Sequence, residues 1–253
     1  LDDYNSVSNT QMKLVLFLDA LEHVSRICRV IRLPLGNALL LGVGGSGRQS
    51  LTRLATYMEE FELFQVEIAK GYGQTEWKDD LKRALLMAGV EGKPTTFLFV
   101  DTQIVWEGQL EDINGILNAG DVPNLMDAVE DQETIATAMR PILKERGEQP
   151  TKLALYAEFN SRVRANLHMV ICMSPIGAAF ASRMRMFPSL INCCAIDWFS
   201  EWPAQALSSV ATNFLSDVEM PEGTLPKMVD MCVHVHQSVE KMSRVYFDEL
   251  RRT

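Results

Sequence analysis

Short apolar runs alternate with helical patterns along most of the chain. A run that is apolar throughout predicts a buried strand, and apolar residues recurring every three or four positions predict a helix. Strands are expected at residues 37–42, 64–68, 95–100, 169–173 and 191–196. Their alternation with helices predicts an α/β fold with a five-stranded, mostly parallel sheet flanked by helices.

The predicted helices fill the intervals between these strands. One is expected to be capped by Ser8 or Asn9 and to end at Pro34. Others are expected from the turn after the first strand to about residue 60, and at residues 76–88, 107–117, 132–144, 153–167 and 177–186. Residues 1–9 are predicted to form turns, and residues 118–131 an insertion or surface connection.

Beyond residue 200 the pattern is helical, with one break near Pro221–Gly223. Apolar residues in the last helix alternate at spacings of three and four: Leu225, Met228, Cys232, Val235, Val239, Met242 and Tyr246. This seam is typical of a coiled coil, and an ordinary core-facing helix gives the same pattern over so few turns. The change of character divides the chain into an α/β part, residues 1–200, and a small helical part, residues 201–253.

Composition narrows the class of protein. The 253 residues are 47% hydrophobic, and 24 basic against 33 acidic residues give a net charge of −9. That balance argues against a broad nucleic-acid-binding surface, and no apolar run approaches the ~20 residues of a membrane span. Five scattered cysteines without a C-x-x-C pair indicate reduced, buried thiols. The chain begins with Leu1, so it looks excised from a longer protein.

The main candidate for chemistry is a glycine-rich turn between the first strand and a helix. Its glycines let successive backbone N–H groups face one anion, and the helix that follows presents its positive end. Against the pattern G-x-x-x-x-G-K-[ST], Gly42 and Gly47 match, whereas Arg48 replaces Lys and Gln49 replaces Ser or Thr. The alternative is that this segment is a glycine-rich turn that binds no ligand. The expected nucleotide-contacting residues are Gly42, Val43, Gly44, Gly45, Ser46, Gly47, Arg48, Gln49 and Ser50.

Two further candidates follow predicted strands. Asp101 ends the third strand and Ser174 follows the fourth, and ligands of parallel sheets bind at the carboxyl ends of the strands. Asp101 fits an acid that holds a metal, although a turn aspartate is the alternative. Gln49 lacks the small hydroxyl that normally ligates Mg²⁺, so its amide oxygen, or Ser50, is expected to substitute imperfectly.

Thr102 stands where hydrolysing relatives of this arrangement carry a glutamate that activates water. Losing a positioned base typically costs ~100- to 10,000-fold in rate, and Glu107 is not expected to fill the gap. No catalytic residue is therefore assigned. Arg183 and Arg185 precede the fifth strand, where ring-forming nucleotidases place an arginine that reaches the neighbouring subunit's phosphate. Surface arginines are the alternative.

Short motifs spread along the chain carry a family resemblance: Gly42-Val-Gly-Gly-Ser-Gly-Arg-Gln-Ser-Leu, Lys70-Gly-Tyr-Gly, Phe99-Val-Asp-Thr-Gln, Glu111-Asp-Ile-Asn, Val122-Pro-Asn-Leu, Cys172-Met-Ser-Pro-Ile-Gly and Phe187-Pro-Ser-Leu-Ile-Asn-Cys-Cys-Ala-Ile-Asp-Trp. Together they resemble the fourth AAA+ module of axonemal dynein heavy chains, essentially end to end. The cytoplasmic counterpart keeps a more ordinary Lys-Thr loop, so the Arg-Gln form favours the ciliary branch.

The resemblance implies an AAA+ P-loop fold with a helical lid, one of six modules in a motor ring. It implies binding of ATP or ADP, with Mg²⁺ as a candidate metal, and a role in tuning a motor whose first module does most of the hydrolysis. Ser174 would match the sensor position, where a polar amide is more usual. Arg183 and Arg185 would serve the preceding module's site, and the helix from Leu225 would lead toward the coiled-coil stalk.

The implied partners are the neighbouring modules of the same heavy chain. Other parts of the full protein would bind dynein intermediate and light chains and microtubules, and neither nucleic acid nor a membrane is expected. The implied location is the cytoplasm and cytoskeleton, in the ciliary or flagellar axoneme.

Three hypotheses for the module stay open at this point. It binds nucleotide with weak or no hydrolysis and regulates the motor, or it is an active ATPase with Gln49 and a neighbouring residue covering the losses, or it is a structural spacer. The intact glycines and Asp101 favour the first.

Overall fold

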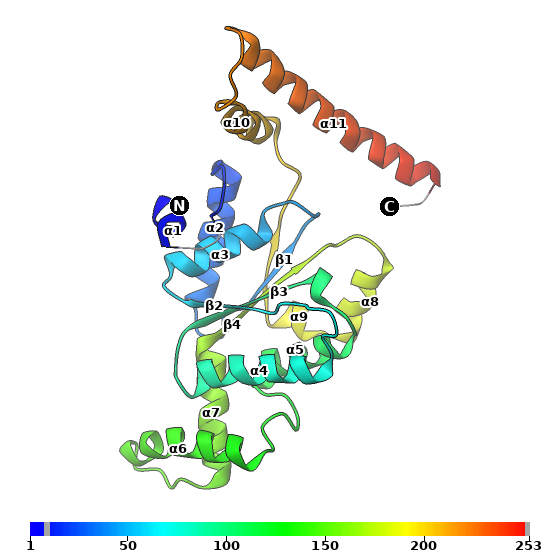
Figure 1. Ribbon diagram of the computed structural model, residues 1–253. Coiled ribbons are helices and arrows are strands. Elements are labelled where there is room, and N and C mark those ends of the chain that lie inside the picture. The colour runs from blue at the N-terminus through cyan, green and yellow to red at the C-terminus, as the bar shows by residue number, and fades with distance from the viewer. Residues whose placement is uncertain (8–10, 251–253) are drawn as a thin grey trace. The chain divides into compact units, whose positions relative to one another are not determined.

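The computed structural model describes residues 1–7 and 11–250 (Figure 1). The chain forms two compact units. The first comprises Leu1–Met12 and Ala20–Phe199, and the second comprises Lys13–Asp19 and Ser200–Thr253. The assignment of residues 1–200 and 201–253 as large and lid parts of one module stays a prediction. No helix within the described ranges is both long and apolar enough to cross a membrane.

A five-stranded, all-parallel sheet organises the first unit, in the order β2-β3-β4-β1-β5. The strands are β1 (Ala38–Leu41), β2 (Glu62–Gln65), β3 (Thr95–Val100), β4 (Leu167–Met173) and β5 (Ala195–Trp198). Leu41 pairs with both Met173 and Trp198, so β4, β1 and β5 finish level. The predicted α/β class with a parallel sheet is confirmed.

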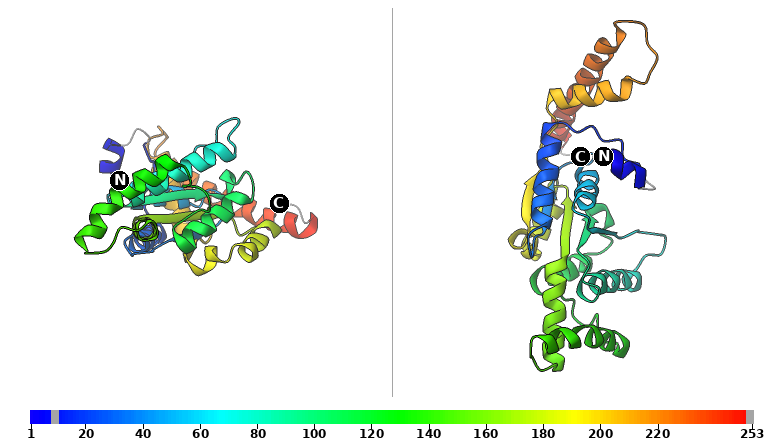
Figure 2. Two further views of the ribbon diagram at one scale, coloured as in Figure 1. Left: turned by 90° about the horizontal axis from the view of Figure 1, so that it is seen from below. Right: turned by 90° about the vertical axis from the view of Figure 1, so that its left-hand side faces the viewer.

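Helices cover both faces of this sheet, as Figure 2 shows. The chain crosses from β1 to β2 in one direction and from β2 to β3 in the other. Parallel crossovers are right-handed, so α3 and α4 lie on opposite faces. The helical elements are α1 (Asp2–Val7), α2 (Leu18–Ile31), α3 (Arg48–Met58), α4 (Gln74–Gly89), the 3-10 turn η1 (Asp101–Gln103), α5 (Gly108–Ala119), α6 (Val129–Glu145), α7 (Lys152–Asn166), α8 (Ala178–Met186) and α9 (Ser189–Asn192).

Local chemistry explains where several helices begin and end. The Thr151 hydroxyl accepts the N–H of Ala154 at 3.2 Å and so caps α7. The carboxylate of Glu76 accepts the N–H of Gly73 at 2.9 Å just before α4. Gly120 ends α5 with φ of 71°, a left-handed conformation that favours glycine. These ends agree with the predicted helices to within a few residues.

The core of the first unit lies on the central strands. β1, β3 and β4 are buried at every residue, which is the pattern of strands covered on both faces. Trp77 of α4 packs 5.6 Å from Phe99, centroid to centroid, and its indole N–H donates to Asp112 at 2.8 Å. Burial raises the pKa of that carboxyl. The core therefore satisfies the polar atom of its largest side chain.

Three sequence-based predictions at the ends of elements are wrong. Residues 1–9 were expected to form turns, but Asp2–Val7 is helical. The next helix begins at Leu18, and its expected caps Ser8 and Asn9 lie outside the described residues. The second strand is Glu62–Gln65, earlier than the predicted 64–68.

The predictions for residues 118–131 and 191–196 are also corrected. Val122, Leu125 and Met126 are buried in the core cluster, so the connection does not lie on the surface, and its being an insertion stays a prediction. Ile191 lies inside the helical turn α9, with its N–H donating to the carbonyl of Pro188 at 3.1 Å, and β5 starts only at Ala195. A short apolar run fits one helical turn as well as a strand, so its sequence could not decide.

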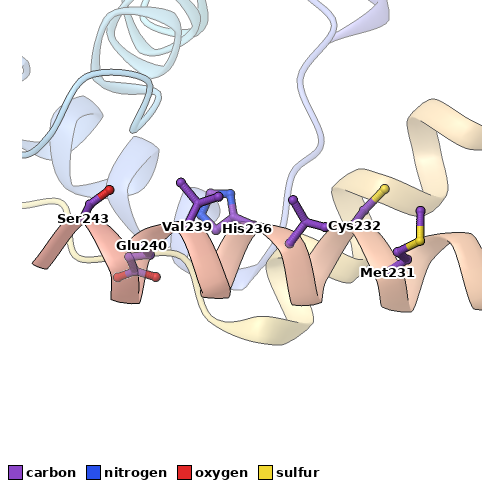
Figure 3. Close-up of a pocket in the computed structure, with 7 residues that line it drawn as sticks. Met231, Cys232, His236, Val239, Glu240 and Ser243 are labelled. Atoms are coloured by element: carbon purple, nitrogen blue, oxygen red, sulfur yellow. The ribbon is translucent and has the colours of Figure 1, made fainter. Parts of the chain in front are cut away.

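The second unit contains α10 (Ala204–Leu215) and α11 (Thr224–Leu250), separated by the predicted break near Pro221–Gly223. Val229 of α11 is 7% exposed, whereas Val235, Val239 and Met242 of the apolar seam are 52%, 59% and 63% exposed. Figure 3 shows the pocket along this face of α11, whose lining includes Val239 and Met231. The unit does not use the seam as its own core, and the coiled-coil alternative stays a prediction.

Candidate functional site

The turn between β1 and α3 is an open backbone cradle. Gly45 and Gly47 have φ of 80° and 89°, which side-chain-bearing residues rarely adopt. Gly47 precedes α3, and no side chain caps the helix there, so its first N–H groups stay available to an anion. A methyl group built on Gly44, Gly45 or Gly47 meets nothing within 4 Å. The space above these three glycines is therefore open, and the free N–H groups at the start of α3 face no side chain that caps them.

Gly42 has a different role from the other glycines of the turn. A Cβ there would lie 2.8 Å from the Cβ of Phe199 and 3.1 Å from the Oγ of Ser46. Close packing, not backbone freedom, therefore requires glycine at this position. The Ser46 hydroxyl itself is buried and has no hydrogen-bond partner among the described residues. A buried hydroxyl without a partner costs about 1–3 kcal/mol of stability, so the turn contains a polar group that needs a hydrogen-bond partner.

Arg48 connects the turn to the neighbouring strand. Its Nη1 donates to the carbonyl of Met173 at 2.5 Å, and its Nη2 donates to the carbonyl of Val43 at 3.1 Å. The N–H of Gly42 donates to the same Met173 carbonyl at 3.2 Å. The guanidinium is therefore fixed at the carboxyl edge of β4 and β1, beside the cradle.

The structure brings Asp101 and Ser174 together, as their places after β3 and β4 predict. The Oδ2 atom of Asp101 accepts the backbone N–H of Ser174 at 2.7 Å. Thr102 follows in the 3-10 turn and its side chain is exposed. The turn thus presents one carboxylate toward the end of β4 and has no second acid beside it in the chain.

Gln103 is a supporting residue that sequence reasoning missed. It is buried, its Oε1 accepts the N–H of Val100 at 2.9 Å, and its Nε2 donates to the carbonyl of Val66 at 2.5 Å. It therefore ties the turn that carries Asp101 to the segment after β2. The available signal was an amide side chain close after a buried strand, where backbone groups need partners.

The donor set beside the cradle does not fit Mg²⁺ well. Mg²⁺ prefers near-octahedral oxygen ligands, and a P-loop normally offers a small hydroxyl and an acid. Here Gln49 offers a neutral amide in place of the hydroxyl. Asp101 follows Val100, which is level with Leu40 across β4, so its carboxylate comes from the same edge of the sheet as the cradle. Within residues 1–7 and 11–250, no group of three or more His, Cys, Asp or Glu side chains could hold a metal ion. The site fits a phosphate better than it fits the metal.

The two arginines of α8 have different surroundings. Arg183 makes a forked ion pair with Glu107, with Nη2 to Oε1 at 2.9 Å and Nε to Oε1 at 3.1 Å. Arg185 is exposed, and its Nε donates to the carbonyl of Ala181 in its own helix at 3.2 Å. Glu107 is thus engaged by Arg183. Arg185 forms no ion pair with an acidic side chain among the described residues.

A second group missed from sequence supports the turn from the side of β5. The ring of Phe199 stacks on His23 of α2, with centroids 3.8 Å apart and an interplanar angle of 10°. His23 Nδ1 lies 2.7 Å from Asp197 Oδ2, and Arg26 donates to the other oxygen of that carboxylate at 3.1 Å. Because Phe199 also packs on Gly42, this group links α2 to the start of the cradle. The aromatic sequence after residue 196 was its only signal.

The buried thiols in the core of the first unit have low reactivity as nucleophiles. Burial raises the pKa of Cys172 to about 12 and that of Cys28 to about 11, so neither forms a thiolate near neutral pH. Cys193 and Cys194 are partly buried, and Cys232 is exposed. The prediction of buried thiols is therefore wrong for Cys232.

Residues 12–253 match the family model described as P-loop containing dynein motor region D4. The chain is 55% identical to the human protein named dynein axonemal heavy chain 1 and 52% identical to human dynein axonemal heavy chain 6. It is 50% identical to the Chlamydomonas reinhardtii dynein-1-beta heavy chain of the flagellar inner arm I1 complex. Each alignment covers 100% of this chain and 6% of the relative, so the chain spans a small part of these proteins.

Proposed function

The chain belongs to the family of the P-loop containing dynein motor region D4, and from this premise we propose that it is a regulatory, adenine-nucleotide-binding module of a ciliary dynein motor. In this proposal it binds ATP or ADP and hydrolyses it weakly or not at all. The names of the relatives, axonemal heavy chains and a flagellar inner-arm chain, support the ciliary or flagellar axoneme as the location.

One observation carries the nucleotide part of the proposal. The open glycine cradle and Asp101 are both in place, whereas the residue after Asp101 is Thr102, whose short hydroxyl cannot act as a strong general base. Glu107, the next acid, is engaged by Arg183. A missing base typically lowers the rate ~100- to 10,000-fold, so binding with poor turnover is the expected combination.

The proposal assigns roles to the site residues. Backbone N–H groups of the cradle, from Val43 to Ser50, would hold the phosphates, since the Gly42 N–H already donates to the Met173 carbonyl. Asp101 and Ser174 would lie at the end nearest the terminal phosphate. We expect Arg185, more than Arg183, to act on the neighbouring module's phosphates, because Arg183 would first have to leave Glu107. Intermediate and light chains and microtubules would be reached only through other parts of the full heavy chain.

The test measures resident nucleotide in the full heavy chain. The protein is purified without added nucleotide and denatured, and the released nucleotide is counted for wild type and for Gly47→Glu, which fills the cradle with a negative side chain. Gly147→Glu is the matched control, because Gly147 also has a positive φ of 74° with nothing within 4 Å and lies far along the chain from the cradle.

We expect Gly47→Glu to lose one equivalent of nucleotide and Gly147→Glu to lose none. Equal content in all three proteins would contradict nucleotide binding and favour the structural spacer. Phosphate release in the same proteins addresses hydrolysis. If the rate of phosphate release falls in Gly47→Glu but not in Gly147→Glu, and ADP is recovered from a site that was supplied only with ATP, the active ATPase would be favoured.

A further inference from the structure

Two polar residues of the cradle differ from those of an ordinary P-loop, and the changes affect the ligands available to a metal ion. The hydroxyl that normally ligates Mg²⁺ is replaced by the Gln49 amide, and the Lys ammonium by the Arg48 guanidinium. The remaining metal ligand, Asp101, already accepts the Ser174 N–H at 2.7 Å through one oxygen. The site has therefore lost the hydroxyl that ligates the metal and kept a cation of its own.

Arg48 is placed to supply the charge that a metal would otherwise bring. Its contacts with the carbonyls of Met173 and Val43 fix the guanidinium at the cradle before any ligand binds. A guanidinium carries five N–H donors, so these two bonds leave three for an anion. Its planar fork suits phosphate oxygens. Little side-chain entropy remains to be lost on binding, because the side chain is already anchored.

Asp101 comes from the same edge of the sheet as the cradle, because Val100 and Leu40 are level across β4. At that edge it would discriminate between a diphosphate and a triphosphate. In a site with a metal, the cation separates the carboxylate from the terminal phosphate and neutralises both. Without one, the carboxylate and a third phosphoryl group are like charges at short range, which disfavour each other. A diphosphate places less negative charge beside Asp101.

We propose that this module holds a nucleoside diphosphate without a divalent cation, with Arg48 providing the positive charge. The inference rests on the proposed nucleotide-binding function and adds the ligand class and the metal independence.

The test measures how much ADP the full heavy chain retains after gel filtration in buffer with Mg²⁺ or with EDTA. ADP bound by other modules cancels when the content of Gly47→Glu is subtracted from that of wild type. We expect this difference to be one equivalent in both buffers. When ATP replaces ADP in the loading step, we expect a smaller difference in EDTA.

A second variant reverses the chemistry. Arg48→Lys combined with Gln49→Thr restores the ordinary pattern, and we expect its retained ADP to become dependent on Mg²⁺. Arg53→Lys is the matched control, since Arg53 lies in the same helix and its guanidinium is engaged by the side chain of Gln65 at 2.7 Å. It should retain ADP in both buffers, as wild type does.

The outcomes separate the two proposals. A difference of one equivalent in Mg²⁺ that disappears in EDTA would overturn the metal independence and leave nucleotide binding intact. Equal retention of ATP and ADP in EDTA would overturn the preference for the diphosphate. A wild-type chain that matches Gly47→Glu in both buffers would overturn nucleotide binding itself. The wild-type comparison decides the question even if the double variant fails to fold.

Discussion

Gly42 and Gly44 lie two residues apart in one turn, yet they meet different surroundings. A Cβ on Gly42 would lie 2.8 Å from a side-chain atom of Phe199 and 3.0 Å from its carbonyl oxygen, whereas a Cβ on Gly44 meets nothing within 4 Å. Glycines of a phosphate-binding loop are usually discussed for backbone freedom. At Gly42 the reason is instead the close approach of the chain after β5.

We therefore predict that Gly42→Ala destabilises the turn and that Gly44→Ala does not. Overpacking typically costs about 1–3 kcal/mol, because backbone or neighbours must shift. The measurement is hydrogen exchange of peptides covering residues 38–58 in the full heavy chain, which reports the free energy of local opening. Similar exchange in both variants would show that the contact with Phe199 yields easily.

His168 is a buried histidine with one defined partner. It is 3% exposed, and its Nδ1 lies 2.8 Å from the carbonyl oxygen of Gly36. A carbonyl only accepts, so Nδ1 carries the proton of the neutral ring. Burial lowers the pKa of His168 below its usual value, because the charged form would lose its hydration.

This direction predicts that acid weakens the first unit through His168. Above the ordinary histidine pKa of about 6.5 the ring is neutral in both states, and its contribution is complete. As pH falls below that value the unfolded chain binds the proton first, and stability is lost until the lower folded pKa is passed. His168→Gln removes this proton uptake. We expect the free energy of opening of residues 167–173, from hydrogen exchange corrected for intrinsic rates, to fall between pH 7 and pH 5.5 more steeply in wild type than in His168→Gln.

At the scale of elements, α7 holds the end of α4. Arg162 donates to the carbonyl of Gly89 at 2.7 Å, and Asn166 donates to the carbonyl of Ala88 at 3.0 Å, so two carbonyls at the helix end receive partners from the neighbouring helix. Gly89 also allows the close approach, because a Cβ there would lie 2.4 Å from a ring carbon of Phe159. The contact joins α7, which precedes β4, to the end of α4, which precedes β3.

Gly89→Ala should loosen this contact and expose the end of α4. We expect a loss of about 1–3 kcal/mol in local stability, since the ring of Phe159 must move within a buried cluster. Gly73→Ala, just before the start of the same helix, is the control, because a Cβ there makes only ordinary contacts of 3.4 and 3.9 Å. Hydrogen exchange of α4 and α7 checks both variants, and unchanged protection in Gly89→Ala would contradict the expected overpacking.

At the scale of the whole molecule, the second unit draws on two distant parts of the chain. Lys13–Asp19 belongs to it together with Ser200–Thr253. The ring of Phe17 packs edge-on against that of Trp202, with centroids 5.3 Å apart. A segment before the first strand is thus held by one that follows the last strand.

Trp202→Ala should release the segment around Phe17. Aromatic pairs of this geometry contribute about 0.5–1.5 kcal/mol beyond the area they bury, so we expect faster hydrogen exchange in residues 11–19. Phe214→Ala removes another aromatic side chain of the same unit, one that is 52% exposed, and should leave that exchange unchanged. Equal effects of the two substitutions would show that the segment is held by other contacts.

The sequence by itself determined the features that depend on neighbouring residues. The apolar run Thr95–Val100 has the bounds of β3, because a strand buried on both faces needs apolar residues at every position. The glycines after β1 predicted the cradle, because the positive φ angles of Gly45 and Gly47 are a local demand. The alternation of strands and helices predicted the parallel sheet, and Asp101 and Ser174 met because parallel strands end at one edge.

Only the tertiary structure decided the features that depend on residues far apart in the chain. Arg48 turns toward Met173, 125 residues away, and Arg183 is engaged by Glu107, 76 residues away. Neither partner can be chosen from local spacing, because several carbonyls and acids lie within reach of a long side chain. The same reason explains why residues 191–196 were taken for a strand and residues 118–131 for a surface connection. Burial and pairing partners belong to the folded chain, and they decide among local conformations of similar free energy.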